Sequence, residues 1–126
     1  MNHIFVEEQL IIRKKHSCYI CSRNWKSIFY TDTAAALRAS EISANVILKA
    51  IKIDGVYSDD PKKNKKTIKY NTIKYSDILA KNLKIMDASA IALARDNNIP
   101  IIVFPINKKN AFLDAIFNKG KYTIIK

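Results

Sequence analysis

The chain has 126 residues, of which 48% are hydrophobic and 26% are charged, a composition typical of one small globular domain. Its 22 Lys and Arg residues outnumber 11 Asp and Glu, and the resulting formal charge of +11 attracts nucleotides, nucleic acids and anionic lipids without selecting among them. No apolar run approaches the roughly 20 residues that cross a bilayer, and the sequence after Met1 lacks the pattern of a secretory signal. We therefore expect a cytoplasmic protein that does not enter a membrane.

Cysteine and glycine usage limits the kinds of site that the sequence can contain. Cys18 and Cys21 form a Cys-x-x-Cys pair with His16 just upstream, but a structural zinc site needs four ligands and no second pair follows. We predict no metal site. Gly55 and Gly120 are the only glycines and lie far apart, whereas loops that cradle phosphates need clustered glycines. The sequence therefore contains no such loop.

Predicted elements become clear only in the second quarter of the chain. Residues 1–27 show no clear periodicity. Residues 32–42 are rich in strong helix formers and follow Thr31, which predicts an N-capped helix. Residues 45–50 predict a short buried strand that leads into a turn at Asp54 and Gly55.

The rest of the chain continues the alternation of helices and strands. Residues 57–66 are polar and include a lysine run, which predicts an exposed loop. Residues 76–83 and 87–96 predict two helices, the first capped by its serine, residues 100–104 a buried strand, and residues 111–117 a final helix. This order favours an α/β fold with a parallel sheet, in which ligands lie at the carboxyl ends of the strands.

Five motifs follow one another between Phe29 and Pro100. They are Tyr-Thr-Asp-Thr-Ala-Ala-Ala-Leu-Arg-Ala at 30–39, Lys-Ala-Ile-Lys-Ile-Asp-Gly-Val-Tyr at 49–57, Asp-Pro-Lys at 60–62, Lys-Asn-Leu-Lys-Ile-Met-Asp at 81–87, and Ala-Leu-Ala-Arg-Asp-Asn-Asn-Ile-Pro at 92–100. In this order they resemble the bacterial-type UMP kinases, or uridylate kinases, of the amino acid kinase superfamily, from about Phe29 to the C-terminus. The resemblance implies the C-terminal, nucleotide-binding part of the amino acid kinase fold, a three-layer α/β/α sandwich.

The same resemblance implies transfer of the γ-phosphoryl group of ATP to UMP, with Mg2+, a reaction that depends on positioning and charge neutralisation. By residue, it implies a catalytic role for Asp32, UMP binding by Phe29 and Thr31, and ATP binding by Tyr57 and Asp60. It assigns no metal ligand in this chain. It also implies a homo-hexamer that GTP activates and UTP inhibits.

Three of these residues also have a purely structural interpretation. Asp32 could be a helix N-cap, Asp60 a turn residue before proline, and Tyr57 a half-buried aromatic. We expect Asp87 to cap its helix rather than to contact substrate. Ile51 departs from the family, which usually has a threonine that touches ATP at this position, so one hydroxyl contact is lost.

The resemblance ends abruptly upstream of Phe29. The family has a loop of the form Gly-Thr-Gly-Asn-Pro-Phe-Phe-Thr-Thr-Asp, of which this chain retains only the end. Codons that spell residues 21–27, read one nucleotide later, can give Val-Ala-Gly-Thr-Gly-Asn-Pro, and Trp25 has a single codon that must supply its part of this loop. We therefore infer a frameshift near Ile28, which divides the chain into an out-of-frame or unpatterned segment, 1–27, and the C-terminal part of a UMP kinase domain, 28–126.

Three functions follow from these observations. The first is UMP kinase by family, with this chain inactive alone because no part of it supplies the lysine and glycine-rich turns that stabilise phosphate charge. The second is a non-catalytic fragment of a decayed or frameshifted gene. The third is a basic nucleic-acid-binding module, which the sequence does not favour because no aromatic or helix-turn-helix signature accompanies the charge.

Overall fold

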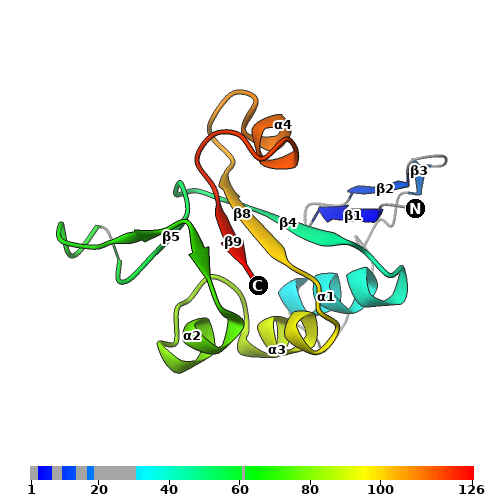
Figure 1. Ribbon diagram of the computed structural model, residues 1–126, viewed down its shortest axis with the longest axis horizontal. Helices are drawn as coiled ribbons and strands as arrows, with labels where there is room; N and C mark the ends of the chain where they lie inside the picture. The colour runs from blue at the N-terminus through cyan, green and yellow to red at the C-terminus, as the bar shows by residue number, and fades with distance from the viewer. Residues whose placement is uncertain (1–2, 7–9, 14–16, 19–30, 61) are drawn as a thin grey trace.

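The computed structural model describes residues 3–6, 10–13, 17–18, 31–60 and 62–126, with the backbone alone up to Thr31. Its described strands form one seven-stranded sheet in the order β3-β2-β1-β4-β8-β9-β7 and a separate antiparallel pair, β5-β6 (Figure 1). The strands are β1 (His3–Val6), β2 (Leu10–Arg13), β3 (Ser17–Cys18), β4 (Val46–Ile51), β5 (Val56–Tyr57), β6 (Lys69–Tyr70), β7 (Thr72–Ile73), β8 (Ile101–Pro105) and β9 (Thr123–Ile125). The helices are α1 (Thr31–Glu41), α2 (Tyr75–Ala80), α3 (Ala88–Asp96) and α4 (Ala111–Ile116).

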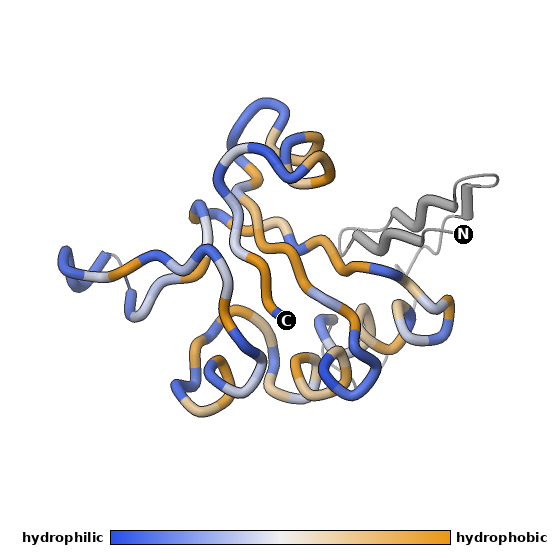
Figure 2. The backbone as a smooth tube through the Cα atoms, in the orientation of Figure 1, coloured by the Kyte–Doolittle hydropathy of each residue, from blue (hydrophilic) through white to orange (hydrophobic). Residues whose placement is uncertain are grey.

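Strands β4 and β8 form the centre of the sheet. They pair in parallel, with Ile47 opposite Ile101 and Lys49 opposite Val103. Both strands are nearly continuous apolar runs, as expected of parallel strands that are covered on both faces. Figure 2 shows this apolar character along β4, β8 and β9, in contrast to the polar loops around them.

Helices cover both faces of the sheet and create two hydrophobic cores. On one face, α1, α2 and α3 pack around Ile47, Ile101 and Ile125. On the other face, α4 packs through Ala115 against Leu48 and Phe104 (Figure 1). The result is the three-layer α/β/α arrangement that the sequence predicts.

All four predicted helices and both predicted strands are present, within one or two residues at most ends. The predicted parallel sheet is mixed, however, because β9 pairs antiparallel with β8 and parallel with β7. Strands β5, β6, β7 and β9 were not predicted, and Tyr57 belongs to β5 rather than to the exposed loop.

Two predicted helix caps do not form. Helix α2 begins at Tyr75, one residue before Ser76, and neither its N-cap residue, Lys74, nor Asp87 at the start of α3 makes a capping hydrogen bond with its side chain. Asp87 does occupy the predicted N-cap position, where its carbonyl oxygen accepts a hydrogen bond from the N–H of Ile91 at 3.1 Å.

Three short strands lie in the segment 1–27, for which the sequence predicts no element. The backbone of β1 runs parallel to β4 and pairs antiparallel with β2, which pairs in turn with β3. His16, Cys21 and Trp25 lie outside the described residues, and the side chain of Cys18 is not described. The out-of-frame origin of this segment stays a prediction. Within the described part of the chain, no helix combines the length and apolar character needed to span a membrane.

Candidate functional site

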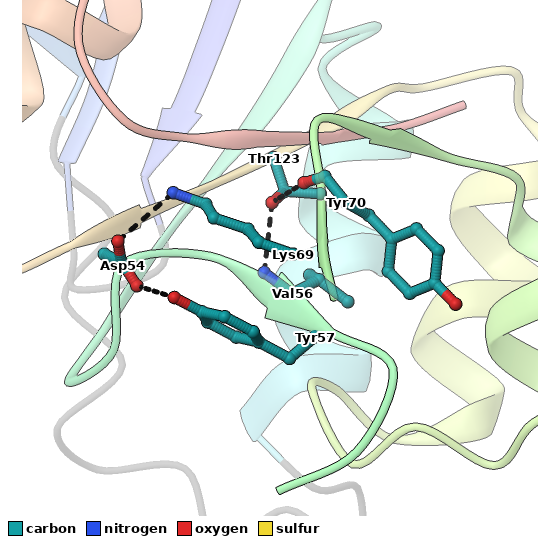
Figure 3. Close-up of polar contacts among 6 residues, drawn as sticks. All are labelled: Asp54, Val56, Tyr57, Lys69, Tyr70 and Thr123. Carbon is teal, nitrogen blue, oxygen red and sulfur yellow. Dashed lines mark hydrogen bonds and ion pairs between the residues drawn. The ribbon is translucent and has the colours of Figure 1, made fainter. Parts of the chain in front are cut away.

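Residues 56–70, here called the arm, leave the body of the protein as strand β5, continue through a polar segment and return as strand β6 (Figure 1). The side chain of Thr123 on β9 joins both strands of the arm to the sheet (Figure 3). The backbone N–H of Val56 donates to Thr123 Oγ1 at 3.0 Å, and this hydroxyl donates to the carbonyl oxygen of Tyr70 at 2.6 Å. Thr123 and Val56 are fully buried, so water cannot replace the bond between them, whereas the bond to Tyr70 is partly buried.

Gly55 precedes the arm at a point where a side chain does not fit. Its φ angle of +153° lies outside the range that other residues adopt readily. A Cβ atom there would lie 2.5 Å from Cε of Lys69 and 2.7 Å from Oγ1 of Thr123. Glycine therefore allows the backbone to pass between these two side chains.

Asp54, Tyr57 and Lys69 form a polar group at the base of the arm (Figure 3). The hydroxyl of Tyr57 donates to Oδ1 of Asp54, and the ammonium of Lys69 donates to Oδ2 at 3.3 Å. The hydrogen bond from Tyr57, supported by Lys69, lowers the pKa of Asp54 against the opposing effect of burial. The same bond raises the pKa of Tyr57. At neutral pH, therefore, an ionised Asp54 holds the ring of a neutral Tyr57 in place.

A cavity of about 580 Å³ opens between the arm and the segment that follows α2. This volume lies within the range of small-molecule sites. Its apolar lining comes from four parts of the chain. Ile51 lies on β4, Ile53 in the turn after it, Val56 on the arm, and Leu83 and Ile85 in the segment after α2. A planar, mostly apolar group such as a nucleobase suits this surface.

The polar lining of the cavity contains both signs of charge. Asp59 and Asp60 contribute carboxylates from the arm. Lys63, also on the arm, and Lys81 and Lys84, after α2, contribute ammonium groups. Carboxylates accept hydrogen bonds from sugar hydroxyls, and lysines attract phosphates. The arrangement therefore offers separate partners for the base, sugar and phosphate parts of a nucleotide.

Tyr57 and Asp60, both predicted to bind ATP, line this same cavity. Asp60 also stabilises a turn, as its structural interpretation predicts. Its Oδ1 accepts a hydrogen bond from the N–H of Lys62 at 2.9 Å. Its carbonyl oxygen accepts from the N–H groups of Lys63 and Asn64, both at 3.0 Å. The two interpretations of Asp60 are thus compatible.

Asp32 lies in the first turn of α1, one residue after the helix begins, so it does not occupy the N-cap position. Its Oδ1 accepts a hydrogen bond from the ammonium of Lys49 on β4 at 2.8 Å, and both side chains are largely buried, at 20% and 16% exposed. Asp32 does not line the cavity. Lys49 precedes the cavity residue Ile51 by two positions on β4, so the ion pair and the cavity share one face of the sheet.

The structure does not describe the side chains of the two residues predicted to bind UMP. Phe29 lies outside the described residues. Thr31 is the first residue of α1, and its side chain is not described.

Several residues of the site were missed by sequence reasoning. Lys81, Leu83 and Ile85 line the cavity, and the motif at 81–87 was the signal that could have assigned them. Asp54 was interpreted only as part of a turn, although it orients Tyr57. Among the residues whose side chains are described, no group of three or more His, Cys, Asp or Glu side chains could hold a metal ion.

The sequence pattern of the amino acid kinase family matches residues 14–105, and so includes part of the segment before Phe29. Uridylate kinases of Roseobacter denitrificans and Wolbachia pipientis wMel are 47% and 54% identical to the chain over 115 and 97 residues, respectively. These alignments cover 91% and 77% of this chain, but only 48% and 39% of the two relatives. The chain thus spans about half the length of these relatives, or less.

Solved structures give the same result. The UMP kinase of Ureaplasma parvum superposes with a TM-score of 0.75 at 45% identity, over 79% of this chain and 43% of that one. The UMP kinase of Bacillus anthracis gives a TM-score of 0.77 at 33% identity, over 82% and 43%. The predicted resemblance and fold are confirmed: the chain belongs to the amino acid kinase family, and within that family it resembles the bacterial uridylate kinases.

Proposed function

We propose that this chain provides the ATP-binding part of a uridylate kinase, which transfers the γ-phosphoryl group of ATP to UMP and releases ADP and UDP. The observation that supports this most directly is the cavity in which Tyr57 and Asp60 lie together with an apolar lining. In this proposal adenine lies against Tyr57, and the ribose donates hydrogen bonds to Asp60.

Asp32 acts on the reacting groups rather than on the base. Its carboxylate, already paired with Lys49, orients the cationic groups around the transferring phosphoryl. Phe29 and Thr31 belong to the segment that closes on UMP. Mg2+ bound together with ATP would neutralise phosphate charge. We assign no residue of this chain as its ligand.

The complete reaction needs groups that this sequence lacks. With two separate glycines, the chain has no glycine-rich loop for the phosphates. We propose that the part of the relatives that it does not match supplies this function. The chain alone should therefore form no ADP in response to UMP, and activity should appear when that part is supplied in frame. Turnover by the purified 126-residue chain would contradict this proposal. Hexamer formation and control by GTP and UTP stay predictions for the assembled enzyme.

Nucleotide binding by the chain tests the proposed site directly. Tyr57→Ala should weaken ATP binding by about tenfold, because stacking of a base on an aromatic ring contributes about 1–3 kcal/mol. Isothermal titration calorimetry with ATP and MgCl2 measures the effect. Phe117→Ala is a matched control, since Phe117 is 67% exposed and lies after α4, on the other face of the sheet. Equal affinities for the two variants would exclude Tyr57 from the site.

The proposed frameshift is tested by the nucleotide sequence of the gene. A second frame that encodes Gly-Thr-Gly-Asn-Pro across residues 23–27 and continues upstream would establish the interruption. The competing expectation is that these residues are genuine, since the family match begins at residue 14. Absence of such a frame would establish that expectation instead.

A further inference from the structure

Among the lysines of the cavity, Lys81 contacts an aromatic residue, Tyr70, through its ammonium group. It follows the last residue of α2, and its ammonium donates a hydrogen bond to the hydroxyl of Tyr70 at 3.0 Å. The same ammonium lies 5.1 Å from the centre of the Tyr70 ring. The backbone of Tyr70 is fixed by the bond between its carbonyl oxygen and Thr123, and its side chain packs against the hydrophobic core. The sheet therefore determines where this exposed cation sits.

A held lysine binds an anion better than a mobile one. Ordering a free lysine side chain on binding costs conformational entropy, and Tyr70 has already restricted that freedom. The hydrogen bond to Tyr70 also raises the pKa of Lys81, in keeping with a contact that favours the charged ammonium. Within the cavity, Asp59 and Asp60 repel phosphates from the arm side. Of the three lysines that line the cavity, Lys63 shares the arm with these carboxylates, whereas Lys81 and Lys84 lie after α2 and are therefore the more favourable partners for a polyphosphate.

We infer that Lys81, positioned by Tyr70, binds the polyphosphate of the nucleotide and makes the cavity select nucleoside triphosphates over nucleosides. This inference depends on the proposed function, because it takes the cavity as the nucleotide site. It assigns to the arm a second function besides presenting Tyr57 and Asp60. Strand β6 sets the position of the cation on the opposite wall.

Calorimetric titration of the full chain with ATP and with adenosine, each in MgCl2, separates the phosphate contact from binding of the base and sugar. Lys81→Met should weaken ATP binding about five- to tenfold and leave adenosine binding within about twofold, because a charge-assisted contact is lost only with ATP. Lys81→Arg keeps the positive charge, so it should lose less ATP affinity than Lys81→Met. Tyr70→Phe keeps the ring and removes the hydroxyl, and it should weaken ATP binding about two- to threefold.

Lys66→Met is the matched control, because Lys66 is an exposed lysine of the arm that does not line the cavity. It makes the same change in net charge and should alter neither affinity by more than about twofold, as long-range charge effects are screened by salt. Equal loss of ATP affinity in Lys81→Met and Lys66→Met would overturn the inference. An equal loss of adenosine affinity in Lys81→Met would also overturn it, because it would mean that Lys81 only shapes the cavity. If the unchanged chain binds neither ligand, the proposed function fails and the inference fails with it.

Discussion

Replacing Thr123 with valine tests how the arm is attached to the sheet. Valine has nearly the same shape as threonine, so the change removes the hydroxyl without leaving a cavity. The N–H of Val56 then loses its acceptor in a fully buried position, which costs about 1–3 kcal/mol. The carbonyl oxygen of Tyr70 loses its donor at a partly buried position, where about 1 kcal/mol is the expected cost. The loss of both hydrogen bonds means that Thr123→Val should lower the free energy of unfolding by about 2–4 kcal/mol.

Urea denaturation followed by circular dichroism at 222 nm measures this loss, provided that the slope against urea concentration is unchanged. Thr72→Val on β7 is the control, because Thr72 is exposed and its replacement should change stability by less than about 0.5 kcal/mol. Thr123→Ser keeps the hydroxyl and removes one methyl group, so it should cost only about 1 kcal/mol. If Thr123→Val is as stable as Thr72→Val, the hydroxyl does not attach the arm.

Two further changes test other parts of the same structure. Tyr75 donates to the carbonyl oxygen of Ile99, and burial raises its pKa to about 12. Because an unfolded tyrosine ionises near pH 10, its stabilising effect is complete below pH 10 and is lost as the pH rises through 12. Between pH 9 and pH 11 the unchanged chain should therefore lose about 1.4 kcal/mol more unfolding free energy than Tyr75→Phe, and parallel pH profiles would refute this. Gly55→Ala should lower the free energy of unfolding by about 2–4 kcal/mol, because it introduces backbone strain and close contacts. Gly120→Ala, whose Cβ would lie no closer than 3.1 Å to its neighbours, should cost less, and equal losses in urea denaturation would contradict the contacts proposed at Gly55.

The sequence predicted the elements that are stabilised by their own composition. Helix α1 and strand β4 are examples, because a run of alanines favours a helix locally and a continuous apolar run favours a buried strand. The two-residue strands β5, β6 and β7 have no such local signal. Strand β5 is fixed by a hydroxyl 67 positions away in the sequence, and no periodicity can indicate a contact of that kind.

The candidate site shows the same division between local and distant information. Tyr57 and Asp60 could be selected because they stand in motifs that resemble a family. The ion pair of Asp32 with Lys49 and the bond of Lys81 with Tyr70 could not be predicted in this way, since they span 17 and 11 positions. Spacings of this length follow from how α1 and the arm pack on the sheet. The motifs therefore indicated candidate site residues, and the structure showed the contacts that position them.

Strand β4 connects the two parts of the proposed active site. Lys49 pairs with Asp32 and Ile51 lines the cavity, and residues two apart on a strand are separated by about 7 Å on the same face. Phosphoryl transfer depends on positioning, so in the proposed site a displacement of about 1 Å between the Asp32 carboxylate and the nucleotide would slow the reaction severely. Strand β4 is paired on both sides and covered on both faces, so close packing restricts its movement. The proposed recognition of the base, which tolerates small shifts better, lies instead on the arm, which Thr123 attaches to the sheet.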